Sequence, residues 1–248
     1  MPQLINRLLL SITCLCFFAL PADADVIEFA VGEWAPYISN KDPNSPLEKI
    51  VSEAYALEGI EVKYSYFPWK RSYGYAKKGR FLGTFPWTHL RSRAEDFNIN
   101  PTPILKDPSV YFHLKHTDFE WATLTSLKQY KVGVTVGYKN QEIYERLGIP
   151  AEVVPYEELN FKMLLQGRID VYGASKRVGY AMIKSMFPPD EVKQFTNHPE
   201  PYTTDIYHIL FSKQAKDSEK YMNAFEAGFS KLKNSGRYEE ILKSSDIN

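Results

Sequence analysis

The sequence predicts an α/β fold with two lobes joined by two strands. Over residues 26–86, strand-like stretches alternate with helical patterns in the order strand, helix, strand, helix, strand. This is the order of βαβ units, which form parallel sheets. The same alternation restarts over residues 124–186. Two further strand-like runs, residues 110–114 and 206–211, leave the first unit and return to it, so we expect two hinge strands and a cleft between the lobes.

The first unit begins with a strand over residues 26–31. Ser45, Pro46 and Glu48 follow, with the spacing of a capping box and a proline at the first helical position. They predict the start of a helix, whose apolar stripe ends before Gly59. The unit continues with a strand at residues 62–67 and a helix at residues 69–78.

The stretch 81–97 is the main candidate for a binding site. It begins as an apolar run with a glycine, which predicts a buried strand ending at Pro86. We expect an exposed loop after it, carrying Trp87, Thr88, Arg91 and Arg93. An arginine fork can hold a carboxylate through two parallel hydrogen bonds, and ligands of open α/β sheets lie at the carboxyl ends of the strands. The stretch therefore predicts an oxyanion-binding corner.

The second unit and the C-terminal part are predicted from the same periodicities and from glycine and proline stops. The predicted strands are residues 131–136, 151–154 and 169–174. The predicted helices are residues 124–129, 141–147, 157–166, a segment ending at 186, 217–233 and 238–242.

Composition and motifs exclude several functional classes. The chain has 248 residues, with 30 Lys and Arg against 30 Asp and Glu, so the basic excess of a nucleic-acid binder is absent. The sequence has no G-x-S-x-G, H-E-x-x-H or phosphate-loop motif. His113 and His116 fall on opposite faces of an expected strand, which does not suit a shared metal. We therefore expect no catalytic residues, no metal site and no cofactor.

Residues 1–24 have the pattern of a cleaved signal peptide. Arg7 supplies the positive charge, residues 8–20 form an apolar segment too short for a comfortable membrane span, and Ala22-Asp23-Ala24 is an A-x-A cleavage site. Both cysteines lie in this segment, so the mature chain would contain none. The alternatives are a membrane anchor and a lipoprotein attached through one of these cysteines.

Five segments together resemble a known family. They are GEWAPYIS, FPWTHLRSRAEDFNINPTPI, LKQYKVGVTVGYKNQEIYERL, LLQGRIDVYGAS and GFSKLKNSGRYEEIL. In order and spacing they resemble the bacterial extracellular solute-binding proteins of family 3, the periplasmic polar-amino-acid-binding components of ABC transporters. The resemblance implies a two-lobed periplasmic-binding-protein fold of type II with two hinge strands. It places residues 25–112 plus 207–248 in lobe 1 and residues 113–206 in lobe 2.

The resemblance also implies where a carboxylate is bound. The carboxylate-gripping arginine of the family falls on Arg93 and the hydroxyl residue five before it on Thr88. Arg91 is the alternative clamp. The anion site of the second lobe falls on Gly137 and Tyr138, before a helix whose backbone N–H groups suit a carboxylate.

Aromatic residues are the other candidates for the cleft. The aromatic platform of the family falls on Trp34, with Tyr37 close by. Trp69 and Trp87 each follow a proline at the end of a strand, and either could line the cleft or pack on its hinge side. Arg71 is a further candidate, with an exposed helix face as the alternative.

The sequence departs from the family at Ser175. Amino-acid binders of this family have an aspartate five residues after the position of Asp170, where it holds the ligand ammonium. A neutral serine cannot supply a charge-assisted hydrogen bond, which contributes roughly 1.5–3 kcal/mol. We therefore expect Ser175 to line the site while standard α-amino acids bind weakly.

The resulting hypothesis is a monomeric periplasmic protein that captures a small polar, carboxylate-bearing solute for ABC-type uptake. Its partners would be the solute and an inner-membrane permease, with no nucleic acid and no enzymatic activity. Two alternatives remain, a periplasmic ligand sensor for a membrane receptor and a periplasmic enzyme on the same fold.

Cleavage after Ala24 can be tested on exported protein. Because the A-x-A site precedes Asp25, intact mass spectrometry should show a chain that starts at Asp25 and carries no lipid. A diacylglyceryl group on an N-terminal cysteine would contradict this prediction.

Overall fold

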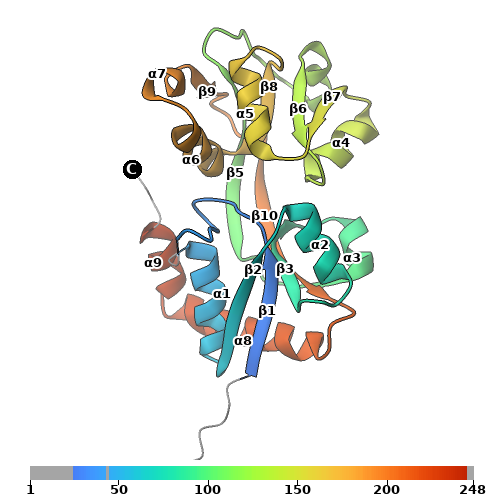
Figure 1. Ribbon diagram of the computed structural model, residues 1–248, viewed down its shortest axis with the longest axis vertical. Coiled ribbons are helices and arrows are strands. Elements are labelled where there is room, and N and C mark those ends of the chain that lie inside the picture. Colours follow the sequence, from blue (N-terminus) through green and yellow to red (C-terminus); the bar gives the residue numbers. More distant parts are fainter. Residues whose placement is uncertain (1–24, 43–44, 245–248) are drawn as a thin grey trace, which may run out of the picture.

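The computed structural model describes residues 25–42 and 45–244, and the predicted signal peptide lies outside this range. The described chain forms two lobes, one above the other in Figure 1, with two long strands running between them. No helix in the described part is long and apolar enough to cross a membrane.

Lobe 1 is a sheet with helices packed on it. Its parallel strands are β1 (Asp25–Val31), β2 (Ile60–Tyr66) and β3 (Gly83–Thr88). Its helices are α1 (Pro46–Ala56), α2 (Trp69–Lys77), α3 (Arg91–Asp96), α8 (Ser218–Asn234) and α9 (Arg237–Ser244). The phenyl ring of Phe29 is edge-to-face with Phe85 and Phe211 at 5.5 and 6.0 Å between centroids, so β1, β3 and β10 share one core.

Lobe 2 repeats this design with a smaller parallel sheet. Its parallel strands are β6 (Val132–Thr135), β7 (Ala151–Val154) and β8 (Val171–Ser175), and the short strand β9 (Phe195–Asn197) pairs antiparallel with β5. Its helices are α4 (Lys139–Leu147), α5 (Glu157–Leu165), α6 (Lys176–Met186), α7 (Pro189–Val192) and the 3₁₀ helix η1 (Leu124–Gln129). Two apolar clusters, one around Phe112 and Phe161 and one around Tyr111 and Tyr144, form its core.

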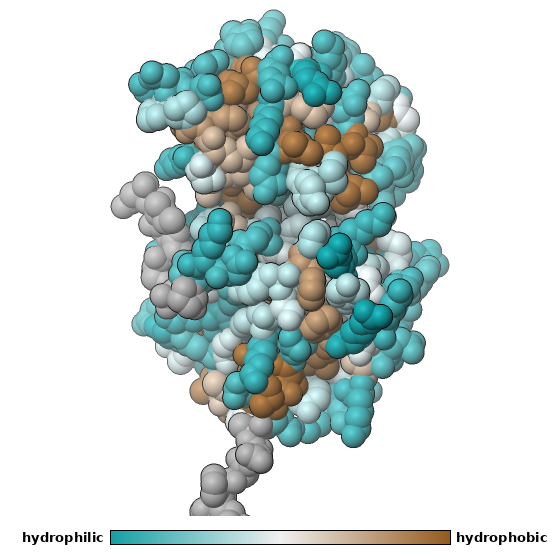
Figure 2. Space-filling model, viewed as in Figure 1, coloured by the Kyte–Doolittle hydropathy of each residue, from teal (hydrophilic) through white to brown (hydrophobic). Residues whose placement is uncertain are grey.

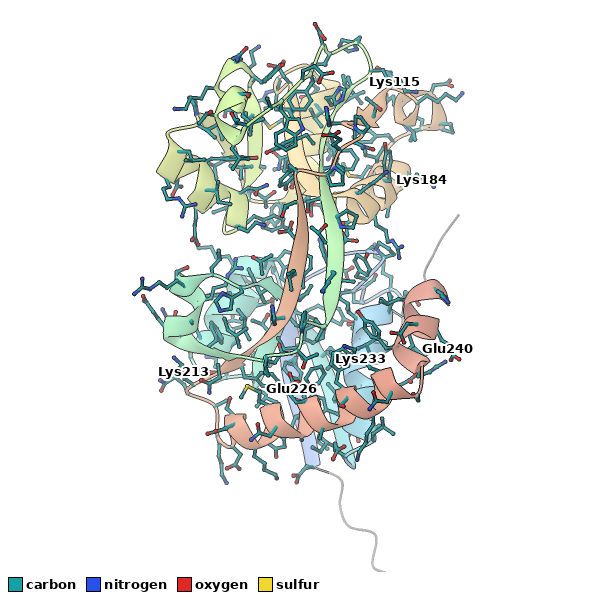
Figure 3. All side chains as sticks on the ribbon, turned by 180° about the vertical axis from the view of Figure 1, so that it is seen from behind. Lys115, Lys184, Lys213, Glu226, Lys233 and Glu240 are labelled. Atoms are coloured by element: carbon teal, nitrogen blue, oxygen red, sulfur yellow. The ribbon has the colours of Figure 1, made fainter. Side chains whose placement is uncertain are left out.

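The strands β5 (Leu105–Leu114) and β10 (Thr203–Ser212) connect the lobes. They run side by side through the waist of the molecule and pair antiparallel, with Asp107 opposite Asp205 (Figure 3). Outside this segment β5 pairs with β8 in lobe 2, and β10 pairs with β3 in lobe 1. One sheet therefore runs through the molecule in the order β2-β1-β3-β10-β5-β8-β6-β7. The lobe boundaries at residues 112 and 206 stay predictions, because both strands belong to both lobes.

The structure corrects the sequence analysis near the main candidate stretch. The strand β3 does not end at Pro86 but continues to Thr88, because Trp87 and Thr88 pair with His208 and Tyr207 of β10. The exposed loop predicted after it is wrong, because residues 91–96 form the helix α3.

The predicted capping box at α1 is also wrong. No side chain caps this helix, although Pro46 takes the first helical position. The Ser45 hydroxyl donates instead to the carbonyl oxygen of Asp42, at 2.8 Å. Glu48 is buried and accepts a hydrogen bond from the Tyr66 hydroxyl.

Three short elements were not predicted, namely β4 (Phe97–Ile99), α7 and β9. Each has only three or four residues, too few to show a periodicity.

On the face shown in Figure 2 the molecule narrows between the lobes, and hydrophilic side chains cover most of its outer surface.

The contact between α1 and α8 generates a stability prediction. A Cβ atom on Gly228 of α8 would lie 1.9 Å from the carbonyl oxygen of Ala54 in α1, so Gly228→Ala forces the two helices apart. We expect a loss of about 1–3 kcal/mol in the free energy of unfolding. Gly74 of α2 is the matched control, since nothing lies within 4 Å of its added Cβ, and Gly74→Ala should stabilise by roughly 0.5–1 kcal/mol. Urea unfolding of both variants is the measurement, and a Gly228→Ala protein as stable as the parent would refute the close packing.

Candidate functional site

A cavity lies between the lobes at the carboxyl ends of β3, β6 and β8, where ligands of α/β sheets bind. Its volume is about 80 Å³. That is room for roughly five to eight water molecules, the scale of a small solute. The lining residues come from both lobes and from both hinge strands: Trp34, Trp69, Pro86, Trp87, Thr88, Arg93, Ser109, Tyr138, Lys139, Asn140, Glu157, Gly173, Ala174, Ser175, Tyr202, Asp205 and Tyr207.

Arg93 is held in the cavity wall by groups from both lobes. Its Nη1 donates to the backbone oxygen of Thr88 at 2.6 Å and to the Thr88 hydroxyl at 2.8 Å. Its Nη2 donates to the backbone oxygen of Gly137 in lobe 2, at 3.2 Å. The guanidinium also lies 4.7 Å from the ring centroid of Trp87, within cation–π distance. The side chain is therefore oriented before any solute arrives.

The charge of Arg93 has no counter-ion in the described part of the chain. The residue is only 5% exposed, and no carboxylate of residues 25–42 or 45–244 forms an ion pair with it. Burial lowers its pKa to about 10, because removing water disfavours the charged form. Arg91, the alternative clamp, is exposed on α3. The cavity thus contains a buried cation that an anionic solute would neutralise.

Aromatic rings form the apolar part of the lobe 1 wall. Trp34 is buried, with its ring centroid 5.0 Å from that of Tyr207 and 5.1 Å from that of Tyr37. Trp69 and Trp87 lie edge-to-face at 5.5 Å. Trp87 also donates its indole N–H to the Thr84 hydroxyl at 3.0 Å, which fixes the orientation of the ring.

Three predicted residues, Tyr37, Arg71 and Gly137, lie outside the cavity wall. Tyr37 is buried behind Trp34, and its hydroxyl donates to Asp107 at 2.6 Å. Arg71 is exposed on α2 and is not among the lining residues.

The turn before α4 contributes in a different way from the one predicted. Gly137 has a φ of +79°, and its N–H donates to the Gln141 side chain at 2.7 Å. Its carbonyl oxygen accepts the hydrogen bond from Arg93, so this residue joins the two lobes and does not line the cavity. Tyr138 does line it, and the Tyr138 hydroxyl donates to Glu157 at 3.1 Å.

Ser175 lines the cavity but also has a structural role. Its hydroxyl accepts the N–H of Val178 at 3.1 Å and so caps α6. It lies opposite Ser109 in the pairing of β5 with β8, so two neutral hydroxyl residues form this part of the wall. Neither of these two residues supplies the charge expected of an ammonium partner.

The sequence analysis missed the charged groups on the opposite wall. Lys139, the first residue of α4, forms an ion pair with Asp205 of the hinge strand β10. Asp205 also accepts a hydrogen bond from the Ser109 hydroxyl at 2.6 Å. A lysine at a helix N-terminus opposes the helix dipole, and this was the one signal in the sequence that marked Lys139. Asp205 showed no such signal.

Glu157 was missed as well, since it is an ordinary acidic residue in the first turn of a helix. It is buried between Tyr138 and Tyr172, and burial raises its pKa to about 7. The hydrogen bond from the Tyr138 hydroxyl lowers the pKa of Glu157, but the loss of water on burial raises it by more. The described residues contain no group of three or more His, Cys, Asp and Glu that could hold a metal ion.

Glu157 generates a prediction on the pH dependence of stability. Its pKa is raised from 4.5 to about 7, so the folded protein keeps a proton that the unfolded chain has lost in this interval. The free energy of unfolding therefore falls as the pH rises through the interval, by about 3 kcal/mol at most. Glu157→Gln removes this loss, so the variant should gain stability relative to the parent between pH 5 and about pH 8.

Urea unfolding at several pH values is the measurement. Glu158→Gln is the matched control, because Glu158 is exposed and its charge is a smaller cause of the raised Glu157 pKa than burial, so this variant should keep most of the parent's loss of stability. Parallel pH profiles for the parent and Glu157→Gln would contradict the assignment.

Comparisons with known proteins were made for the sequence and for the structure. A scan against models of protein families found no match, and a search of the curated proteins found none either. Solved structures do match. One is a histidine kinase sensor domain with similarity to periplasmic binding proteins, with a TM-score of 0.78, 17% identity, and coverage of 91% of this chain and 98% of that one.

Two amino-acid-binding proteins are also similar. An ancestral arginine-binding protein bound to arginine has a TM-score of 0.74, 16% identity, and coverage of 89% and 98%. The amino acid ABC transporter substrate-binding protein AbpA from Streptococcus pneumoniae, bound to L-arginine, has a TM-score of 0.70, 16% identity, and coverage of 88% and 94%. At these identities the likeness is one of fold. The chain therefore has the type II periplasmic-binding-protein fold, as the motifs predicted.

Proposed function

We propose that this protein is a periplasmic binding protein that captures a small carboxylate-bearing solute in the cavity between its lobes for uptake through an ABC-type permease. The observation that carries the proposal is Arg93, a buried guanidinium with no counter-ion in the described chain. A buried charge without a partner is unfavourable, and a solute carboxylate would supply the partner.

The rest of the cavity supports a small solute with an apolar or flat part. Trp34, Trp69 and Trp87 offer aromatic surface on one side, and Tyr138 and Ser175 offer hydroxyl groups on the other. Few convergent polar groups in a largely apolar pocket are typical of small-molecule sites.

Binding would be coupled to the relative position of the lobes. Arg93 of lobe 1 reaches the Gly137 carbonyl of lobe 2, so a solute bound at Arg93 touches both walls at once. Hinge closure around a ligand is a common response in two-lobed binding proteins, and a loaded closed form is what a permease would recognise. The likeness to non-enzymatic binding proteins supports capture without chemical conversion.

A second candidate function is ligand sensing for a membrane receptor. It is favoured by the similarity to a histidine kinase sensor domain, at a TM-score of 0.78. Cross-linking in cells, followed by identification of the bound protein, separates the two: the transport proposal expects a permease subunit, whereas sensing expects a receptor.

Arg93 variants test the proposed binding mode. A panel of small organic acids and amino acids would first be screened by calorimetry to find the tightest ligand. For that ligand we expect Arg93→Ala to weaken binding by about 100-fold or more, since two charge-assisted hydrogen bonds are lost. Arg93→Lys keeps the charge but loses the planar fork, and should weaken binding by about tenfold.

Arg91→Ala is the matched control, because Arg91 is exposed two residues away on the same helix. It should bind like the parent, and thermal melting should show that all three variants fold. Normal affinity in Arg93→Ala with a loss in Arg91→Ala would move the clamp to Arg91. Normal affinity in both would overturn the carboxylate proposal.

A further inference from the structure

We propose that Lys139 is a specificity-determining residue that occupies the place of a ligand ammonium, so that the cavity selects carboxylates without a free amino group, such as 2-hydroxy acids. The inference rests on the proposed function, since it takes the solute carboxylate at Arg93 as given. It adds the chemical class of the remaining part of the solute.

The first observation is the ion pair inside the cavity. Lys139 Nζ contacts Asp205 Oδ1, and the Ser109 hydroxyl donates to Asp205 Oδ2 at 2.6 Å. All three residues line the cavity, and the Asp205 side chain is only 7% exposed. Both oxygens of this carboxylate are therefore engaged by the protein itself. A ligand ammonium would have to compete with Lys139 for Asp205 and would lie beside its positive charge.

The second observation is the place of Lys139 in its helix. It is the first residue of α4, where a positive charge opposes the helix dipole. Helix stability therefore does not explain a lysine at this position. Its ion pair with Asp205 ties α4 of lobe 2 to the hinge strand β10, and it is the only ion pair that Lys139 makes within the described chain.

The third observation is the balance of charge in the cavity. Lys139 and Asp205 neutralise each other, which leaves the Arg93 guanidinium as the unpaired charge. Ser109 and Ser175 are neutral. The remaining acid, Glu157, is engaged by the Tyr138 hydroxyl and kept partly protonated by burial. A solute with a carboxylate for Arg93 and no positive charge matches this balance.

Asp107, the other carboxylate of the hinge, lies opposite Asp205 in the strand pair and does not line the cavity. Its Oδ1 accepts the Tyr37 hydroxyl, whereas its buried Oδ2 has no hydrogen-bond partner among the described residues. Burial raises the pKa of Asp107, which disfavours its charged form. An ammonium in the cavity would therefore lie near two cations, and the two carboxylates that line the cavity, Asp205 and Glu157, are already engaged.

Two pairs of matched ligands test the inference by calorimetry at pH 7.5. They are L-lactate with L-alanine, and (S)-2-hydroxyglutarate with L-glutamate, each pair differing only in a hydroxyl against an ammonium. In each ligand pair that the parent binds, it should prefer the hydroxy acid over the amino acid by at least tenfold. In Lys139→Met the freed Asp205 can receive the ammonium, so the preference should shift toward the amino acid by at least tenfold.

Three further variants make the result specific. Lys139→Met combined with Asp205→Asn leaves no unpaired buried charge, and it should keep the preference for the hydroxy acid. Lys184→Met replaces an exposed lysine on α6, labelled in Figure 3, and should change nothing. Repeating the measurements in a Glu157→Gln background removes the second carboxyl group, and melting curves establish that each variant folds.

The possible failures are distinguishable. If the parent binds L-alanine or L-glutamate as tightly as its hydroxy acid, the inference is overturned while carboxylate binding stands. An unchanged preference in Lys139→Met also overturns it. So does a parent that prefers amino acids and loses amino-acid binding when Glu157→Gln is introduced, because Glu157 would then be the group that receives the ammonium. If none of the four compounds binds the parent, the inference is overturned, whereas carboxylate binding is decided separately by the ligand panel and the Arg93 variants.

Discussion

The burial of one arginine charge determines how this site is built. The Arg93 guanidinium is removed from water by the contact of two lobes, and oxygens of Thr88 and Gly137 accept three hydrogen bonds from its five N–H groups. Carbonyl oxygens supply partial negative charge but no counter-ion. Arg93 is therefore oriented by these bonds but still lacks a counter-ion among the described residues, and an anion is the group that would complete the site.

The fold provides this arrangement through its sheet order. Because β10 pairs with β3 in lobe 1 and with β5 at the waist, Thr88 at the end of β3 comes close to the hinge. The parallel strands β6 and β8 of lobe 2 end at the same cavity and bring Tyr138 and Ser175 into its wall. Two hinge strands that carry Asp205 and Ser109 form the floor between the two walls.

Local sequence patterns were sufficient for the architecture and for one wall of the site. Periodicity and glycine stops predicted the βα units, and the aromatic and arginine residues of the stretch 81–97 marked the lobe 1 wall. The Trp87 and Thr88 pairing with β10 was not predictable, because the partner strand lies about 120 residues away in the sequence. The ion pair of Lys139 with Asp205 was not predictable for the same reason, because nothing local in either segment indicates the other.

The most direct test of the account is a crystal structure of the protein with the tightest small acid found in a ligand screen. The account predicts that a carboxylate oxygen lies about 2.7–2.9 Å from a guanidinium nitrogen of Arg93, inside the cavity and against the tryptophan rings. A solute bound in the cavity with its carboxylate directed away from Arg93, or bound elsewhere on the molecule, would contradict it.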